Sequence, residues 1–337
     1  MQVLVTGGAG FIGSHTCVEL LHAGYEVVIA DDLSNCSKDV VRRIQQIAQK
    51  QVGFYQIDVA DEAALTRVFA ENRIGCAIHF AGFKAVGESV QRPLAYYQNN
   101  LCTLLTLCKV MTAFDVKRLA FSSSATVYRS DNPMPLTEEA SLGCTNPYGW
   151  SKWMIERILL DLAASDPTWS IALLRYFNPI GAHASGLIGE DPNGIPNNLV
   201  PYIARVAAGT LKELHVFGDD YPTADGTGVR DYIHVVDLAK GHVCALDYLR
   251  AHTGVEPFNL GTGRGHSVLE VLRAFERACG KQLPYVIDPR RPGDIAVCYA
   301  DTQKAQRLLG FTAKHSLLQM CEDAWRWQQA LEKTRMS

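Results

Sequence analysis

The sequence predicts an α/β protein built on a doubly wound parallel sheet. Short apolar segments of strand type alternate with helical segments through residues 1–176, and a glycine-rich turn directly follows the first apolar segment. Alternation of this kind gives a parallel sheet with helices on both of its faces. Glycine, acidic residues or serine stand where the successive strands end, at the edge where sheets of this kind bind ligands.

The predicted strands cover residues 2–6, 26–30, 52–57, 76–81, 117–123 and 169–175. The predicted helices between them cover residues 11–23, 37–50, 61–72, 88–110 and 147–164. Beyond residue 176, the segments 178–198 and 218–231 are rich in Gly, Pro, Asn and Asp, and loops of this length inside a compact chain are usually functional.

A glycine turn follows the first strand, with the sequence Thr6-Gly7-Gly8-Ala9-Gly10-Phe11-Ile12-Gly13, and a helical pattern begins at once. Strand, glycine turn and helix together form the context of the dinucleotide fingerprint, in which a pyrophosphate lies on the helix N-terminus. Asp31-Asp32 ends the second strand, where an acid hydrogen-bonds an adenosine ribose and repels a 2′-phosphate. The sequence therefore predicts NAD as the cofactor rather than NADP.

Tyr148 and Lys152 lie four residues apart in the helix predicted over 147–164, so they share one face of it. A nearby ammonium favours the phenolate form, and a phenol whose pKa falls from about 10 can act as a base near neutral pH. Ser124, after a buried strand, can hydrogen-bond the same reacting oxygen. A Tyr and a Lys four residues apart are common in helices, so this spacing alone is weak evidence. The cofactor motif in the same half of the chain strengthens it.

These motifs define two expected domains. Residues 1–176 are expected to form an NAD-binding Rossmann domain, and residues 177–337 mainly a smaller mixed α/β domain that binds the substrate. Val229–Asp237 and Phe258–Leu260 are strand-like, so segments near 229–260 are expected to return to the main sheet.

Composition and charge narrow the class of protein. The chain has 337 residues, of which 47% are hydrophobic and 20% charged, as in an ordinary globular protein with a sizeable core. A net charge of −3 without a Lys/Arg block argues against nucleic acid or an anionic membrane as partner. The first strand begins at residue 2, so we expect no targeting peptide, and no apolar run approaches the roughly 20 residues of a membrane span. Ten scattered cysteines and ten histidines show no ligand spacing, which predicts reduced thiols, a cytoplasmic location and no metal.

Longer runs resemble one family, the UDP-glucose 4-epimerases among the extended short-chain dehydrogenases/reductases, over nearly the whole chain. The matching runs are Thr6–Gly8, Phe11–Thr16, His79–Gly82, Lys84–Val90, Leu174–Pro179, Gly194–Leu199 and Asp225–Val235. Several of them have no role in generic NAD binding, so they indicate this family rather than the wider superfamily.

The resemblance implies a role for each matching residue. Tyr148 resembles the base that takes the sugar 4-hydroxyl proton, Lys152 the residue that binds the nicotinamide ribose, and Ser124 the hydroxyl that aligns O4. The implied cofactor contacts are Gly7, Gly10, Phe11, Ile12, Gly13, Asp31, Asp32, Leu33, Ser34, Asn35, Cys36, Asp58, Val59, Phe80, Ala81, Gly82, Lys84, Asn99, Ser122, Tyr148, Lys152 and Phe177. The implied UDP-sugar contacts are Ser124, Tyr148, Asn178, Asn198, Leu199, Phe217, Arg230, Arg291, Asp294 and Cys298. The family is commonly homodimeric through helices like those at 88–110 and 147–164.

Three positions depart from the family pattern. Arg129 replaces a common glycine, which costs on the order of 1 kcal/mol if the backbone there has positive φ. Trp150 interrupts the usual motif but points away from the reacting face. Cys298 replaces a tyrosine found beside the sugar in some members, and this smaller residue leads us to expect acceptance of UDP-GlcNAc and UDP-GalNAc as well.

Other interpretations remain open at this stage. Related dehydratases carry an acid–base pair where this chain has Ala125 and Thr126, which argues against dehydration. A dehydrogenase that releases NADH and a non-catalytic NAD-binding sensor are further alternatives. Asp58 can cap a helix instead of contacting adenine, although Asp61 is the better cap candidate. Lys84 can be a solvated lysine, and Asn198 can simply begin a helix.

Overall fold

A seven-stranded parallel sheet forms the centre of the computed structural model, which describes residues 1–192, 194–291 and 293–336. The strand order is β10-β6-β5-β4-β1-β2-β3, and every neighbouring pair runs parallel. The strands are β1 (Gln2–Thr6), β2 (Glu26–Asp31), β3 (Gly53–Gln56), β4 (Ile74–His79), β5 (Arg118–Ser124), β6 (Ser170–Tyr176) and β10 (Gly254–Leu260). The doubly wound parallel sheet predicted from the sequence is confirmed.

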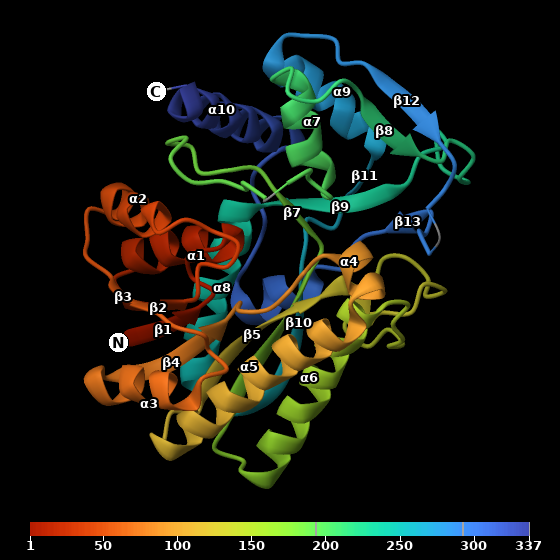
Figure 1. Ribbon diagram of the computed structural model, residues 1–337. Helices are drawn as coiled ribbons and strands as arrows, with labels where there is room; N and C mark the ends of the chain where they lie inside the picture. Colours follow the sequence, from red (N-terminus) through yellow and green to blue (C-terminus); the bar gives the residue numbers. More distant parts are fainter. Residues whose placement is uncertain (193, 292, 337) are drawn as a thin grey trace.

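Helices cover both faces of this sheet (Figure 1). One face carries α1 (Phe11–His22), α2 (Asp39–Ala48) and α8 (Val235–Ala251), and the other carries α3 (Glu62–Glu71), α5 (Pro93–Ala113) and α6 (Pro147–Ser165). Successive residues of β1 alternate between the two faces: Val3 and Val5 join the core with α1 and α8, and Leu4 joins the core with α3 and α5. Both faces are therefore buried, which explains why the strands read as continuous apolar runs.

A second, smaller group of elements lies above the main sheet in Figure 1. Its strands are β7 (Asn178–Ile180), β8 (Leu214–Phe217), β9 (Val229–His234), β11 (Gly265–Ser267), β12 (Tyr285–Asp288) and β13 (Val297–Cys298). Its helices are α7 (Leu199–Ala207), α9 (Val268–Cys279) and α10 (Leu317–Met336). A separate apolar core joins α7, α9 and α10 to β8 and β9.

Segments near 229–260 divide between the two sheets. β10 pairs with β6 at the edge of the main sheet, as expected. The expectation for Val229–Asp237 was wrong, because β9 pairs with β7, β11 and β13 in a second sheet, and α8 begins directly after it. An apolar run shows that a strand is buried, but it does not specify which sheet buries it.

Local sequence signals place the helix boundaries near the site. Asn146 caps α6, since its Oδ1 accepts from the Gly149 N–H at 2.9 Å, and Pro147 takes the first helical position. Asp61 caps α3 in the same way, as expected. The single helix predicted over 88–110 is instead two helices, α4 (Val86–Gln91) and α5, because Pro93 cannot continue a preceding helix.

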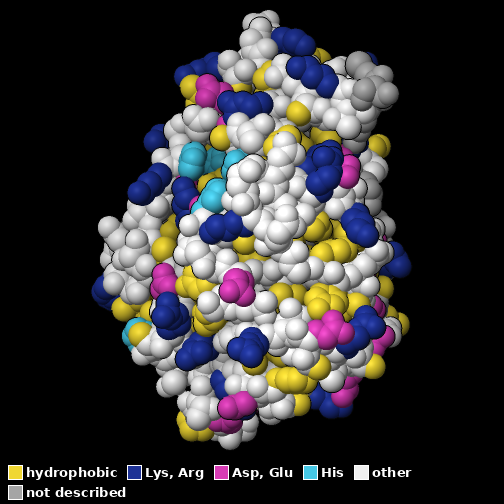
Figure 2. Space-filling model, turned by 90° about the vertical axis from the view of Figure 1, so that its left-hand side faces the viewer, with side chains coloured by type: hydrophobic (Ala, Val, Ile, Leu, Met, Phe, Trp, Pro, Cys, Tyr) yellow, Lys and Arg dark blue, Asp and Glu magenta, His cyan; other side chains and the backbone are white. Residues whose placement is uncertain are grey.

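The two unusual positions on the surface are accommodated. Arg129 does not have positive φ, so the strain considered for it does not arise, and its guanidinium pairs with Asp131. Trp150 is exposed and packs its ring on that of Trp153. On the face shown in Figure 2, Lys and Arg side chains are spread among acidic and uncharged ones, and most of the visible histidines lie in its upper half. Within the described residues, none of the helices is long and apolar enough to cross a membrane.

Candidate active site

The glycine turn after β1 brings backbone segments too close together for any side chain. A Cβ on Gly13 would lie 2.3 Å from the Gly7 carbonyl oxygen, and one on Gly7, at φ +68°, would lie 2.7 Å from the Ala81 nitrogen. Gly10 is the N-cap of α1, and because it has no side chain it leaves the first N–H groups of α1 for another partner. This arrangement fits the pyrophosphate of a dinucleotide at the start of α1.

Asp31 holds this turn in place as well as ending β2. Its buried carboxylate accepts from the Ala9 N–H at 2.9 Å and the Leu33 N–H at 2.9 Å, and from the Cys36 thiol. Burial raises the pKa of Asp31, and the backbone N–H groups act against that rise. Since a carboxylate offers about four acceptor positions, Asp31 retains capacity for a ribose hydroxyl.

The turn after β2 is shaped by Asp32 and its neighbours. Asp32 accepts from both the backbone N–H and the hydroxyl of Ser34, and Leu33 has φ of +63°. Asn35 and Cys36 complete the bend that follows. These side chains stand at the same edge of the sheet as Gly7, because β1 and β2 are adjacent and parallel.

Tyr148 and Lys152 meet the end of β5 from the first turns of α6. The Lys152 ammonium is buried and donates to the Ser122 carbonyl oxygen at 2.7 Å, with the Ser122 hydroxyl at 3.4 Å. Lys152 Nζ also lies 5.8 Å from the centroid of the Tyr148 ring. Ser124 accepts from the N–H and the hydroxyl of Thr126. The three residues predicted from spacing are therefore brought together at one strand end.

The protonation of the pair differs from the expectation for Tyr148. Burial raises the pKa of Tyr148, and only the hydrogen bond with Ser124 lowers it. Burial lowers the pKa of Lys152 to about 7. The lysine points its ammonium at the Ser122 carbonyl rather than at the phenolic oxygen, and the cost of burying a phenolate dominates.

A buried polar network that the sequence analysis missed fixes this arrangement. Glu156, one turn after Lys152, accepts from the Ser123 hydroxyl at 2.6 Å and from Arg175 at 2.7 and 3.0 Å. Arg175 also donates to the Tyr128 hydroxyl at 3.0 Å. The only sequence signal was the combination of charged residues with otherwise apolar positions in α6 and β6. The network ties α6 to β5 and β6 beside Ser124, Tyr148 and Lys152.

Most of the other proposed cofactor residues follow β3, β4 or β6, whereas Asn99 lies in α5 and two more begin α1. Phe80 and Ala81 follow β4, and the Phe80 ring lies 4.8 Å from that of His242. Asn99 donates to the buried Asn100, whose Oδ1 accepts from the Phe83 N–H at 2.8 Å. Gly82 lies beside Asn100, and Phe177 directly follows β6. After β3, Val59 is buried, and Asp58 is exposed and accepts a hydrogen bond from the Ala60 N–H. Phe11 and Ile12 begin α1, and Lys84 Nζ lies 5.7 Å from the Phe11 ring.

Four of the proposed nucleotide residues form one cluster at the second sheet. Asp294 lies between Arg291 at 2.9 Å and Arg230 at 3.9 Å, and the Arg291 guanidinium lies 4.8 Å from the Phe217 ring centroid. Two guanidiniums suit a diphosphate, because each offers a planar fork of donors. Cys298 pairs in register with Arg230.

The remaining proposed substrate residues stand at neighbouring positions. Asn178 begins β7 and pairs in register with Tyr232 of β9. Asn198 is the N-cap of α7 and Leu199 its first residue, but the Asn198 side chain donates to Glu190 and does not cap the helix. Asn198 therefore begins a helix and still presents its amide to another element.

Comparison with known proteins agrees with this geometry. The profile of the NAD dependent epimerase/dehydratase family matches residues 3–261. A UDP-glucose 4-epimerase of Bacillus subtilis is 60% identical over 98% of this chain and 97% of its own. The structure of a UDP-glucose 4-epimerase from Bifidobacterium longum in complex with NAD+ and UDP superposes with a TM-score of 0.95 at 57% identity, covering 98% of both chains. One from Stenotrophomonas maltophila, with bound NAD and formylated UDP-arabinopyranose, gives 0.97 at 52% identity over 99% of both chains. The chain therefore belongs to the NAD dependent epimerase/dehydratase family and, within it, to the UDP-glucose 4-epimerases.

Proposed function

We propose that this protein is an NAD-dependent isomerase that interconverts UDP-glucose and UDP-galactose at C4. The observation that carries the proposal is the meeting of Ser124, Tyr148 and Lys152 at the end of β5, in the same parallel sheet as the strand that leads into the glycine turn. When bound, NAD supplies a reversible hydride acceptor for C4.

Each side chain then has a stated task. Tyr148 takes the proton of the sugar 4-hydroxyl and returns it, and Ser124 aligns that oxygen. Lys152, whose Nζ lies 5.8 Å from the Tyr148 ring centroid, favours the phenolate in its protonated form, against the burial that raises the pKa of Tyr148. Asp31 binds the adenosine ribose of the cofactor, and Lys152 binds its nicotinamide ribose.

Inversion at C4 requires the oxidised sugar to receive the returning hydride on the opposite face of C4, while O4 stays within reach of Tyr148. We propose that Arg230, Arg291, Asp294 and Phe217 hold the UDP group firmly while the sugar turns about its bonds to it. Binding energy from the non-reacting nucleotide then retains the oxidised sugar until hydride returns.

We further propose that the 2-acetamido pair, UDP-GlcNAc and UDP-GalNAc, is also accepted. Cys298 packs against an apolar cluster that includes Phe177 and pairs with Arg230 in the second sheet. A thiol at this place occupies far less volume than a tyrosine ring, which leaves room for an N-acetyl group.

The related dehydration reaction lacks its acid and base here. Ala125 has no ionisable group, and the Thr126 hydroxyl donates to Ser124 at 3.0 Å. A non-catalytic sensor is disfavoured by the presence of both Tyr148 and Lys152 in contact with the strand end.

We also propose a cytoplasmic homodimer. All ten cysteines are free thiols, and α4, α5 and α6 expose large apolar side chains, with Val90 62%, Leu94 81%, Met154 40% and Leu160 43% exposed. Apolar groups gathered on neighbouring helices favour association. Measurement of the solution mass tests this, and we expect Leu94→Glu to shift it toward that of a monomer.

The activity is tested by incubating the purified protein with UDP-galactose and UDP-GalNAc in separate reactions and resolving the products. We expect UDP-glucose from the first and UDP-GlcNAc from the second, without net release of NADH. Failure with UDP-galactose refutes the epimerase assignment, and failure with UDP-GalNAc alone refutes only the wider specificity.

A further inference from the structure

Glu190 lies after β7 in a loop that is fastened to the C-terminal helix α10. The loop leaves β7 and folds back, with an antiparallel bridge between Ala182 and Gly189. The Trp327 indole N–H of α10 donates to the Glu190 carbonyl oxygen at 3.0 Å, and a Cβ on Gly189 would lie 2.4 Å from the Trp327 ring. Close packing at Gly189 and the indole bond therefore fix the backbone of Glu190.

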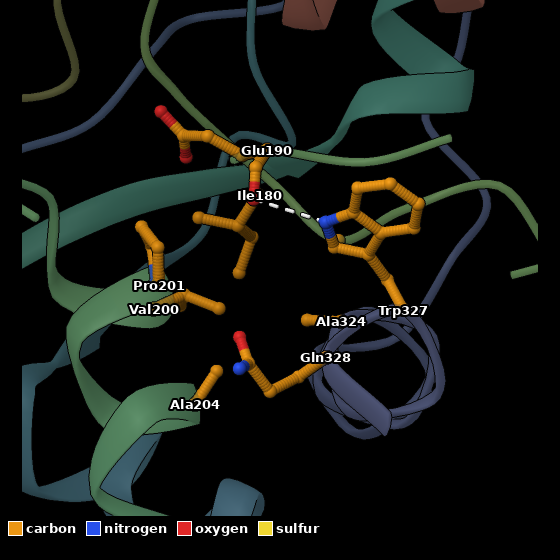
Figure 3. Close-up of a pocket in the computed structure, with 9 residues that line it drawn as sticks. Ile180, Glu190, Val200, Pro201, Ala204, Ala324, Trp327 and Gln328 are labelled. Carbon is orange, nitrogen blue, oxygen red and sulfur yellow. Dashed lines mark hydrogen bonds between the residues drawn. The ribbon is translucent and has the colours of Figure 1, made fainter. Parts of the chain in front are cut away.

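The Glu190 side chain turns away from this attachment. In Figure 3 its carboxylate points out of the small hollow that Trp327, Val200, Ala204 and their neighbours line. Its Oε1 accepts from Lys84 Nζ at 2.9 Å and from Asn198 Nδ2 at 2.8 Å. Only 10% of the Glu190 side chain is exposed, whereas Lys84 is 52% exposed.

One carboxylate oxygen thus joins two segments that carry different proposed ligand contacts. Lys84 follows β4 on the cofactor side, and Asn198 begins α7 on the UDP side. A carboxylate only accepts hydrogen bonds, so the Asn198 amide must turn its nitrogen toward Glu190. This leaves one N–H and the oxygen of Asn198 for a ligand, while Lys84 keeps two of its three donors.

We propose that Glu190 is a positioning residue, which sets the orientation of the Asn198 amide and the place of the Lys84 ammonium and so couples the cofactor side of the site to the UDP side. The inference rests on the proposed function for the roles of Lys84 and Asn198. Loss of a buried acceptor shared by two donors is expected to weaken ligand binding more than it slows the reaction of bound substrate.

The test compares Glu190→Ala and Glu190→Gln with the wild type. We measure the Kd of UDP by calorimetry, the NAD retained per chain, and KM and kcat with UDP-galactose. For Glu190→Ala we expect Kd and KM to rise about tenfold and kcat to change less than about threefold. Glu190→Gln keeps an amide oxygen as acceptor, so we expect it to restore UDP binding to within about threefold of wild type.

The matched control is Glu62→Gln, which alters an exposed pair with Lys109 on α3 and α5. We expect UDP binding and turnover to be unchanged there. A double-mutant cycle combines Glu190→Ala with Asn198→Ala. The fold-loss in UDP affinity of the double variant should be smaller than the product of the two single losses, because both variants remove the same Glu190–Asn198 hydrogen bond. If Glu190→Ala does not fold, Glu190→Met fills the same space without an acceptor and replaces it.

The inference is overturned if UDP binding by a folded Glu190→Ala or Glu190→Met stays within twofold of wild type. It is also overturned if kcat falls with KM unchanged, or if the losses from Glu190 and Asn198 multiply. Failure of the wild type to convert UDP-galactose is a different outcome: it refutes the epimerase activity, while the UDP-binding cycle still decides the role of Glu190.

Discussion

Lys152 Nζ on α6 donates to the backbone carbonyl oxygen of Ser122 at the end of β5, over 2.7 Å. This bond fixes the first turns of the helix against the strand, so that Tyr148 stands beside Ser124. It also explains why a buried ammonium is tolerated, since a carbonyl oxygen satisfies one of its donors. The position of the proposed base is therefore set by the lysine, in addition to any effect of its charge.

Removal of the phenolic oxygen tests the role of Tyr148. We expect Tyr148→Phe to lower kcat with UDP-galactose at least about 1000-fold, because the 4-hydroxyl then has no base. Retained NAD, measured after release by denaturation, should equal that of wild type, since the ring remains. If Tyr148→Phe keeps more than a tenth of the wild-type kcat, another residue must act as the base.

The size of the side chain at position 298 is predicted to decide which sugars are accepted. Cys298→Tyr adds a ring at the place proposed to receive the N-acetyl group, so we expect kcat/KM for UDP-GalNAc to fall at least about tenfold, with UDP-galactose changed less than about threefold. Cys298→Ala keeps the residue small and should retain both activities. Equal losses for both substrates in the tyrosine variant would show that the ring distorts the site rather than narrowing it.

The buried pair of Glu156 and Arg175 is predicted to be important for stability. Glu156→Gln leaves the Arg175 charge uncompensated and presents an N–H₂ group to a donor, so we expect the free energy of unfolding to fall by about 3 kcal/mol. The exposed pair of Glu62 and Lys109 gives the comparison, and Glu62→Gln should cost under about 1 kcal/mol. Urea unfolding of both variants measures the difference, and similar losses would contradict the distinction between buried and exposed pairs.

Buried histidines predict acid sensitivity. Burial lowers the pKa of His79 from 6.5 to about 3 and that of His242 to about 4. Below pH 6.5 the unfolded chain binds protons that the folded chain does not, so the stability is complete above pH 6.5 and is lost as the pH falls toward these lower values. Each such histidine contributes roughly 1 kcal/mol per pH unit within its window.

Replacement of His79 by Asn measures its share of this effect. The Asn amide can keep the bond that His79 Nδ1 makes with the Thr6 hydroxyl at 2.8 Å, but it does not titrate. The slope of the unfolding free energy against pH gives the number of protons taken up on unfolding. Between pH 6 and pH 4 we expect this number to be smaller by about one in the variant. An unchanged slope would mean that His79 already takes up a proton in the folded state.

The sequence by itself determined most strands and helices of the main sheet and the edge of that sheet at which ligands are expected to bind. Gly7 and Gly13 indicate a dinucleotide-binding turn because the close approach of the backbone there excludes side chains. Asp31 follows at the expected place after the second strand. The placement of Tyr148 and Lys152 on one helix face follows from helical periodicity in the same local way. Family resemblance supplied the nucleotide residues, which no local rule identifies.

Only the tertiary structure decided which distant groups meet. β9 joins the second sheet, Glu156 pairs with Arg175, and Glu190 links Lys84 to Asn198 across more than a hundred residues. The raised pKa of Tyr148 likewise follows from burial that the spacing of two residues does not specify. Periodicity and turn chemistry act between near neighbours, whereas pairing and desolvation depend on the packing of the complete chain.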